Sequence, residues 1–138
     1  MTDETGWDQL EGAPRRRAGD LQLADVPHDP GVYAWFRDGQ CVYVGKASNL
    51  RRRLSAHLRT SPDLSRSTLR ASVAARELNV TRATARARPP VITGDQAAVI
   101  NRWLHECDIA WVTCTSPRAA DELERLLRRE RMPELNRL

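Results

Sequence analysis

The stretch GVYAWFRDGQCVYVGK, residues 31–46, places two short runs of aromatic and β-branched residues around an Asp-Gly pair. Such runs form strands, and Asp-Gly between them is typical of the tight turn of a β-hairpin. The stretch holds both tyrosines of the chain, Tyr33 and Tyr43, and its only lysine, Lys46. A hairpin here therefore constrains both the fold and the chemistry.

The length of the hairpin loop decides where the two tyrosines point. A three-residue loop of Arg37, Asp38 and Gly39, with the glycine in a G1 bulge, would put Tyr33 directly opposite Tyr43. A two-residue Asp38-Gly39 turn would shift the pairing by one residue and send the tyrosines to opposite faces. We predict the three-residue loop, with the two tyrosines facing each other across the hairpin.

The rest of the chain adds helices and one strand. A leucine repeat predicts a helix from Ser48 or Asn49 to about Thr60, helical patterns cover 66–88 and 94–106, and DIAWVTC at 108–114 reads as a strand. Ser116 is expected to cap the last helix. The prediction is an α/β (α+β) fold with a small three-stranded antiparallel sheet flanked by helices. Its parts are an N-terminal arm (1–27) and one domain (28–138) with a helical insert at about 61–106.

The composition limits the function classes. The 138 residues suit one domain, and Lys plus Arg exceed Asp plus Glu by 22 to 18. Basic clusters such as 51–53 and 125–131 favour a nucleic-acid partner, although solvated helix faces explain any single cluster equally well. Nothing in the sequence reads as a membrane span or a secretory signal, so we expect a cytoplasmic protein with no membrane partner. The sequence does not define the oligomeric state.

The three cysteines, Cys41, Cys107 and Cys114, are odd in number and lack CxxC spacing. Neither a disulfide framework nor a structural zinc site is therefore expected.

Several polar residues stand out as candidates for a site. Arg53 and His57 are spaced i, i+4 and so share one helix face, where the guanidinium could grip a phosphate and the imidazole could move a proton. Glu124 falls at the edge of an apolar stripe, where a carboxylate needs either an arginine partner or a hard metal ion. Asn136 follows the helix end, where its amide could cap a turn or fix a phosphate or side chain.

Together these segments resemble a known family. GVY at 31–33, YVGKASNLRRRL at 43–54 and AADELERLLRRERMPELN at 119–136 are similar to the GIY-YIG nuclease domain, found in the excision-repair incision subunit and in homing and restriction endonucleases. Valine replaces isoleucine in both signature triplets. The resemblance implies site roles for seven residues: Tyr33, Tyr43, Lys46, Arg53, His57, Glu124 and Asn136.

The resemblance implies a divalent-metal-dependent endonuclease that hydrolyses nucleic-acid phosphodiesters, with DNA as the expected substrate. Glu124 would bind one Mg²⁺ or Mn²⁺, while Arg53 and Lys46 would neutralise the phosphate. We expect the Glu124 carboxylate at the floor of a single cleft lined by Tyr43, Lys46 and Arg53, and we expect Arg53 and His57 to open onto this same cleft. Tyr43 would act as general base, and we expect neighbouring cations to lower its pKa.

Two other hypotheses remain. One is a nucleic-acid-binding module that has the same fold but cleaves little. The other is a helix-turn-helix reader formed by residues 72–87 of the insert, although two short helices that only cover the sheet would show the same pattern.

Overall fold

The computed structural model describes residues 6–137 and contains one antiparallel sheet. Its strands are β1 (Arg16–Arg17), β2 (Gly31–Arg37), β3 (Gln40–Ala47) and β4 (Asp108–Thr113), in the order β1-β4-β2-β3. The α/β class and the antiparallel pairing confirm the sequence prediction, but the sheet has four strands instead of three. The additional strand, β1, is two residues long and pairs with β4, so sequence periodicity could not reveal it.

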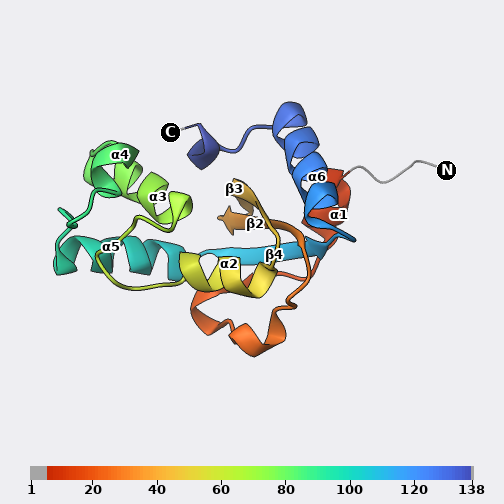
Figure 1. Ribbon diagram of the computed structural model, residues 1–138, viewed down its shortest axis with the longest axis horizontal. Coiled ribbons are helices and arrows are strands. Elements are labelled where there is room, and N and C mark those ends of the chain that lie inside the picture. The colour runs from red at the N-terminus through yellow and green to blue at the C-terminus, as the bar shows by residue number, and fades with distance from the viewer. Residues whose placement is uncertain (1–5, 138) are drawn as a thin grey trace.

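Helices cover both faces of this sheet (Figure 1). Those on one face are α2 (Leu50–His57), α3 (Thr68–Leu78), α4 (Arg82–Ala85) and α5 (Gly94–His105). Those on the other are α1 (Gly6–Gly12) and α6 (Pro117–Glu130). Three 3-10 turns complete the chain: η1 (Ala18–Asp20), η2 (Leu23–Asp25) and η3 (Glu134–Asn136).

The central strand β2 explains the two layers. Its residues alternate between two apolar clusters, with Tyr33 and Trp35 on the face of α2, α3 and α5, and Val32 and Phe36 on the face of α1 and α6. Each face is therefore buried, which fits the apolar and aromatic run that precedes Arg37.

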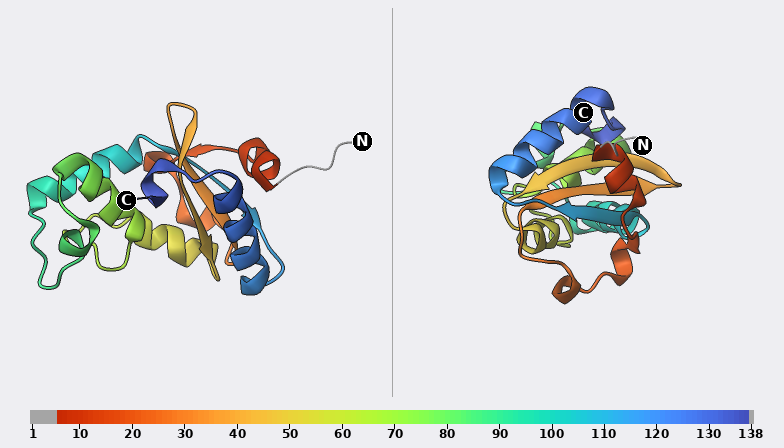
Figure 2. Two further views of the ribbon diagram at one scale, coloured as in Figure 1. Left: turned by 90° about the horizontal axis from the view of Figure 1, so that it is seen from above. Right: turned by 90° about the vertical axis from the view of Figure 1, so that its right-hand side faces the viewer.

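The hairpin turn differs from the predicted one. Arg37 pairs with Gln40, so Asp38 and Gly39 alone form the loop, with φ of 52° and 80°. Positive φ at both positions is the geometry of a type I′ turn, which Asp-Gly suits well. This turn projects from the body of the molecule (Figure 2). The prediction of a three-residue loop was wrong because Asp-Gly already supplies the two left-handed residues that the tighter turn needs.

The segment predicted as an N-terminal arm contains a helix. Trp7 and Leu10 of α1 are buried against α6 and the sheet, and the indole Nε1 of Trp7 donates a hydrogen bond to the carbonyl of Leu127 at 2.9 Å. A helix of only 7 residues, without a repeating apolar stripe, gives too weak a periodic signal to predict.

The insert folds around a buried arginine. Arg70 of α3 is 1% exposed and donates to the carbonyls of Ser61 and Asp63 and to the side chain of Asn101 on α5. These bonds join the loop after α2 to both long helices of the insert. Burial lowers the pKa of Arg70 to about 10, which still leaves it protonated near neutral pH.

The helix-turn-helix hypothesis was wrong. Residues 82–85 form only α4, four residues long, while Leu69 to Ala74 of α3 are buried in the core. A recognition helix must lie in the major groove and present several side chains to base edges, and one turn of helix cannot do so. The insert instead covers one face of the sheet.

Two further predictions concern the whole chain. No helix among the residues that the structure describes is both long and apolar enough to cross a membrane. All three cysteines are free, and burial raises the pKa of Cys41 to about 12 and of Cys107 to about 11, which makes both thiols poor nucleophiles at neutral pH.

Candidate active site

The two tyrosines lie on one face of the sheet through a strand pairing that the sequence did not indicate. Tyr33 pairs with Gly45 and Tyr43 pairs with Trp35, so the tyrosines are diagonal neighbours and not directly opposite as predicted. Phe36 pairs with Cys41, which leaves the residue between Cys41 and Tyr43 as a β-bulge. The bulge reverses the change of face that the two-residue turn imposes. The ring centroids of Tyr33 and Tyr43 are consequently 6.4 Å apart.

Gly45 makes room for the ring of Tyr33. A Cβ atom at Gly45 would lie 2.4 Å from the Tyr33 hydroxyl oxygen and 2.5 Å from its Cζ. The phenol therefore lies directly across the glycine on the neighbouring strand. Any larger residue would displace the Tyr33 hydroxyl.

Beneath the tyrosines lies a buried chain of hydrogen bonds. The Tyr33 hydroxyl is 2.5 Å from Nε2 of His57, and Nδ1 of His57 is 2.7 Å from Oγ of Ser67. The same Oγ accepts a hydrogen bond from the backbone N–H of Arg70 and so caps α3. Tyr33, His57 and Ser67 are each at most 2% exposed. The prediction that His57 opens onto the cleft was wrong, because its ring is sealed beneath Tyr33.

Ser67 was not among the residues predicted for the site. In the sequence it reads only as one of several serines before a helix, and nothing local indicates that its hydroxyl also reaches a histidine on another helix. Its N-cap position, directly before an apolar helical stretch, was the one available signal.

Burial dominates the ionisation of these groups. It lowers the pKa of His57 well below the usual value, and the charges of Arg53 and Arg70 lower it further, so the imidazole is neutral at pH 7. Burial also raises the pKa of Tyr33 and, less strongly, of Tyr43, while Arg53 opposes the rise at both. The expectation of a lowered Tyr43 pKa was wrong, since loss of hydration outweighs the nearby cations.

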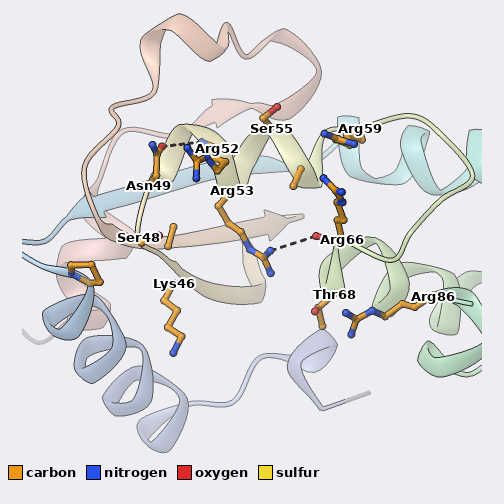
Figure 3. A pocket seen from close by; sticks show the side chains of 13 residues that line it. Lys46, Ser48, Asn49, Arg52, Arg53, Ser55, Arg59, Arg66, Thr68 and Arg86 are labelled. Carbon is orange, nitrogen blue, oxygen red and sulfur yellow. Dashed lines mark hydrogen bonds between the residues drawn. The ribbon is translucent and has the colours of Figure 1, made fainter. Parts of the chain in front are cut away.

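Arg53 and Lys46 face one basic pocket from two elements (Figure 3). Arg53 lies on α2, and its Nη1 donates to the backbone carbonyl of Arg66 in the insert at 3.4 Å. Lys46 follows Gly45 on β3, and its ammonium is paired with the Asp121 carboxylate of α6. The structure thus brings Arg53 and Lys46 together, and it gives Lys46 a carboxylate partner that was not predicted.

Glu124 lies on α6 with its side chain only 12% exposed. It forms an ion pair with Arg128, one turn later, at 3.3 Å. Its negative charge contributes to the raised pKa of both tyrosines, which places it within electrostatic reach of their hydroxyls. Glu124 opens onto a separate hollow of about 310 Å³, away from the pocket that Lys46 and Arg53 line, which differs from the single cleft predicted.

The side chain of Asn136 forms hydrogen bonds with the backbone of β3. Its Oδ1 accepts from the N–H of Val44 and its Nδ2 donates to the carbonyl of Val44, both at 2.9 Å. These two bonds satisfy the backbone N–H and C=O of Val44, which lies between Tyr43 and Gly45 on the edge strand β3. Asn136 therefore fixes the strand that carries Tyr43, a role that differs from the turn cap, phosphate contact or side-chain contact that its position suggested.

The donor set fits a hard divalent cation held by few protein ligands. No group of three or more His, Cys, Asp or Glu residues within 6–137 could hold a metal ion. Magnesium commonly binds one or two carboxylates and keeps several waters, so the single carboxylate of Glu124 suffices. The Arg128 guanidinium already places a positive charge against that carboxylate.

A known protein shares this fold. A solved structure, the GIY-YIG N-terminal endonuclease domain of UvrC from Thermotoga maritima bound to its catalytic magnesium, superposes with a TM-score of 0.52. It is 20% identical, and the match covers 88% of this chain and 98% of that domain. At this identity the similarity shows the fold.

Curated relatives match over shorter stretches. The UvrABC system protein C of Histophilus somni is 55% identical over 40 residues, which are 28% of this chain and 7% of that protein. The Actinobacillus succinogenes protein is 49% identical over 53 residues, 38% of this chain and 8% of its own length. The match thus spans less than a tenth of either relative.

The family comparison covers most of the chain. Residues 31–137 match the family model of the GIY-YIG catalytic domain, which includes every residue of the candidate site. The chain therefore belongs to the GIY-YIG family of nuclease catalytic domains.

Proposed function

We propose that this chain is an endonuclease that hydrolyses DNA phosphodiester bonds and depends on Mg²⁺ or Mn²⁺. The observation that carries the proposal is the grouping of Tyr43, His57 and Arg53 around Tyr33, with the Glu124 carboxylate within electrostatic reach. These groups can bind a phosphate, accept and donate protons, and bind one cation, which are the requirements of phosphodiester hydrolysis.

The two cations of the basic pocket have distinct roles in this proposal. Arg53, half-buried and beside both tyrosines, binds the phosphate to be cleaved through its fork of N–H donors. Lys46 is half-exposed and adds a point charge from β3. A divalent ion on Glu124 would stabilise the leaving oxygen.

Tyr43 is the better candidate for relaying the proton of the attacking water: its phenol oxygen accepts that proton while its own hydroxyl proton passes to an oxygen of the phosphate. It is 7% exposed against 1% for Tyr33, and the charges of Arg53, Arg128 and Arg82 oppose the effect of burial on its pKa. Tyr33 is held by His57 and acts as a hydrogen-bonding group that orients the reactants.

The proposal is tested by cleavage of labelled single-stranded, duplex and branched DNA, and of RNA, with Mg²⁺, with Mn²⁺ and with EDTA. We expect metal-dependent nicking of DNA that is lost in Glu124→Gln and kept in Glu122→Gln. The second variant removes a carboxylate of the same helix whose side chain is 66% exposed. Cleavage retained by Glu124→Gln would contradict the assignment of the metal ligand.

A second candidate function is nucleic-acid binding with little cleavage. The ion pair between Glu124 and Arg128 favours it, because a guanidinium occupies the carboxylate that would otherwise bind metal. In that case the wild-type chain would bind the same DNA in EDTA and would not nick it with either metal.

A further inference from the structure

The basic pocket extends well beyond the two cations assigned to the site. It has a volume of about 760 Å³ and lies between α2 and the insert, with the β3–α2 loop and the start of α6 at one end. Figure 3 shows side chains of α2, β3 and the insert around this space. Its basic lining residues are Lys46, Arg52, Arg53, Arg59, Arg66 and Arg86. The volume is in the range of specific ligand sites.

Lys46 is paired with Asp121, but within the described residues the five arginines of the pocket have no carboxylate partner. No acidic side chain lines the pocket, and within residues 6–137 none of its five arginines forms an ion pair. Elsewhere in the same range, eight of the sixteen arginines are paired with Asp or Glu. A group of unpaired guanidinium ions in one concave space repels itself unless an anion occupies it.

The backbone around the pocket also contributes positive charge. The first residues of α3 and α6, Thr68 and Pro117, line it, as does Asn49, the N-cap of α2. Helix N-termini carry a partial positive charge that adds to that of the arginines.

The insert supplies its own part of this surface. Arg66 precedes α3 and Arg86 follows α4, and both side chains are exposed. Hydrogen bonds hold this wall in place: Nη2 of Arg86 donates to the carbonyl of Ser65, and the carbonyl of Arg66 accepts from Arg53. The wall with Arg66 and Arg86 is thus joined directly to the arginine proposed to bind the reacting phosphate.

We propose that Arg59, Arg66 and Arg86 form a second phosphate-binding site. It holds the sugar-phosphate backbone of a nucleic-acid strand next to the phosphate bound by Arg53 and Lys46. The inference rests on the proposed function for the identity of the strand. Because it uses only guanidinium groups and phosphates, this binding is independent of base sequence and weakens steeply with salt. It also requires a strand long enough to reach both sites.

The test compares two double variants by fluorescence anisotropy in EDTA, so that no cleavage occurs. Arg66→Gln/Arg86→Gln removes two charges from the pocket, and Arg17→Gln/Arg102→Gln removes two exposed charges outside it. The probes are DNA oligonucleotides of about 4 and about 12 nucleotides, measured at several salt concentrations. Thermal unfolding checks that both proteins are folded. If the first variant is not folded, Arg59→Gln replaces it, because the Arg59 side chain makes no hydrogen bond to the described part of the insert.

We expect the pocket variant to bind the longer oligonucleotide at least about tenfold more weakly than wild type. The plot of log affinity against log salt should become shallower by about 1.4, the value for two lost contacts to single-stranded DNA. The short oligonucleotide should bind both proteins alike, and the control variant should bind the long one as wild type does. Equal losses in the two double variants, or no loss in either, would overturn the second phosphate site.

These outcomes are separable from those of the proposed function. A wild-type chain that shows this pattern but does not nick DNA would keep the second site and lose the nuclease assignment. Metal-dependent nicking by wild type, together with unchanged DNA binding by the pocket variant, would support the nuclease assignment and rule out the second phosphate site.

Discussion

The hydroxyl of Tyr33 and Nε2 of His57 lie 2.5 Å apart in the core, and Ser67 holds the other ring nitrogen of the histidine. Oγ of Ser67 accepts a hydrogen bond from the backbone N–H of Arg70. Among the described residues, the hydroxyl hydrogen of Ser67 has one acceptor, which is Nδ1 of His57. If Ser67 donates to Nδ1, then Nε2 carries the ring proton and donates to Tyr33. The hydrogen of the Tyr33 hydroxyl is then left for the site.

Replacing Ser67 should therefore change the tautomer of His57. In Ser67→Gly the helix cap costs only a few tenths of a kcal/mol, but Nδ1 loses its donor, so the proton should move from Nε2 to Nδ1. Nitrogen-15 NMR of the ring distinguishes the two tautomers, and we expect cleavage to fall at least about tenfold. Ser67→Thr keeps the hydroxyl and should keep the wild-type tautomer. An unchanged His57 spectrum in Ser67→Gly would count against this arrangement.

The buried histidine should make folding sensitive to mild acid. Burial lowers the pKa of His57 in the folded protein, whereas in the unfolded chain it titrates near 6.5. Below about pH 6.5 the unfolded state binds a proton that the folded state does not, so stability falls as pH falls, by up to about 1.4 kcal/mol per pH unit. Denaturant unfolding between pH 7.5 and 5 should show this loss in wild type and a much smaller one in His57→Gln. The same slope in both proteins would assign the loss to other groups.

Gly45→Ala should disturb the site through sterics alone. The new Cβ would lie 2.4 Å from the Tyr33 hydroxyl, whose ring is buried and bonded to His57. We expect a loss of about 1–3 kcal/mol in unfolding free energy, together with a clear loss of cleavage. Gly94→Ala is the matched control, because nothing lies within 4 Å of its Cβ position at the start of α5. A fully active, stable Gly45→Ala protein would show that the Tyr33 position is not required.

Arg128→Gln should strengthen metal binding. The Arg128 guanidinium is paired with Glu124 and competes with a cation for the carboxylate. Its removal should tighten Mn²⁺ binding several-fold in an electron paramagnetic resonance titration. Arg118→Gln removes an exposed charge from the same helix outside the hollow that Glu124 lines, and it should leave Mn²⁺ binding unchanged. Weaker Mn²⁺ binding in Arg128→Gln would mean that the guanidinium supports the metal site.

Asn136→Ala should loosen the edge of β3. The variant loses two hydrogen bonds to Val44 and leaves the backbone of that residue without its partner. We expect a cost of about 1–3 kcal/mol and faster amide hydrogen exchange at Val44 than at Trp35 in the strand centre. Unchanged exchange at Val44 would exclude a positioning role for Asn136.

Much of the local structure follows from the sequence because short-range chemistry controls it. Asp-Gly indicated the position of the hairpin turn, although not its two-residue form. Ser116 caps α6 as predicted, Asn49 is one of the two residues expected at the start of α2, and Pro117 starts α6. The separated motifs that carry Tyr33, Tyr43 and Glu124 also identify the family, although each alone is weak.

The tertiary structure decided how those elements combine into a site. The bulge before Tyr43 depends on the packing of both sheet faces, and it alone returns the tyrosines to one side. Ser67 in the insert reaches His57 on α2, and Lys46 on β3 reaches Asp121 on α6. Such partners are set by burial and by contacts between distant segments, which no local pattern of residue types encodes. For the same reason, the raised pKa of Tyr43 could be known only once the depth of its burial was known.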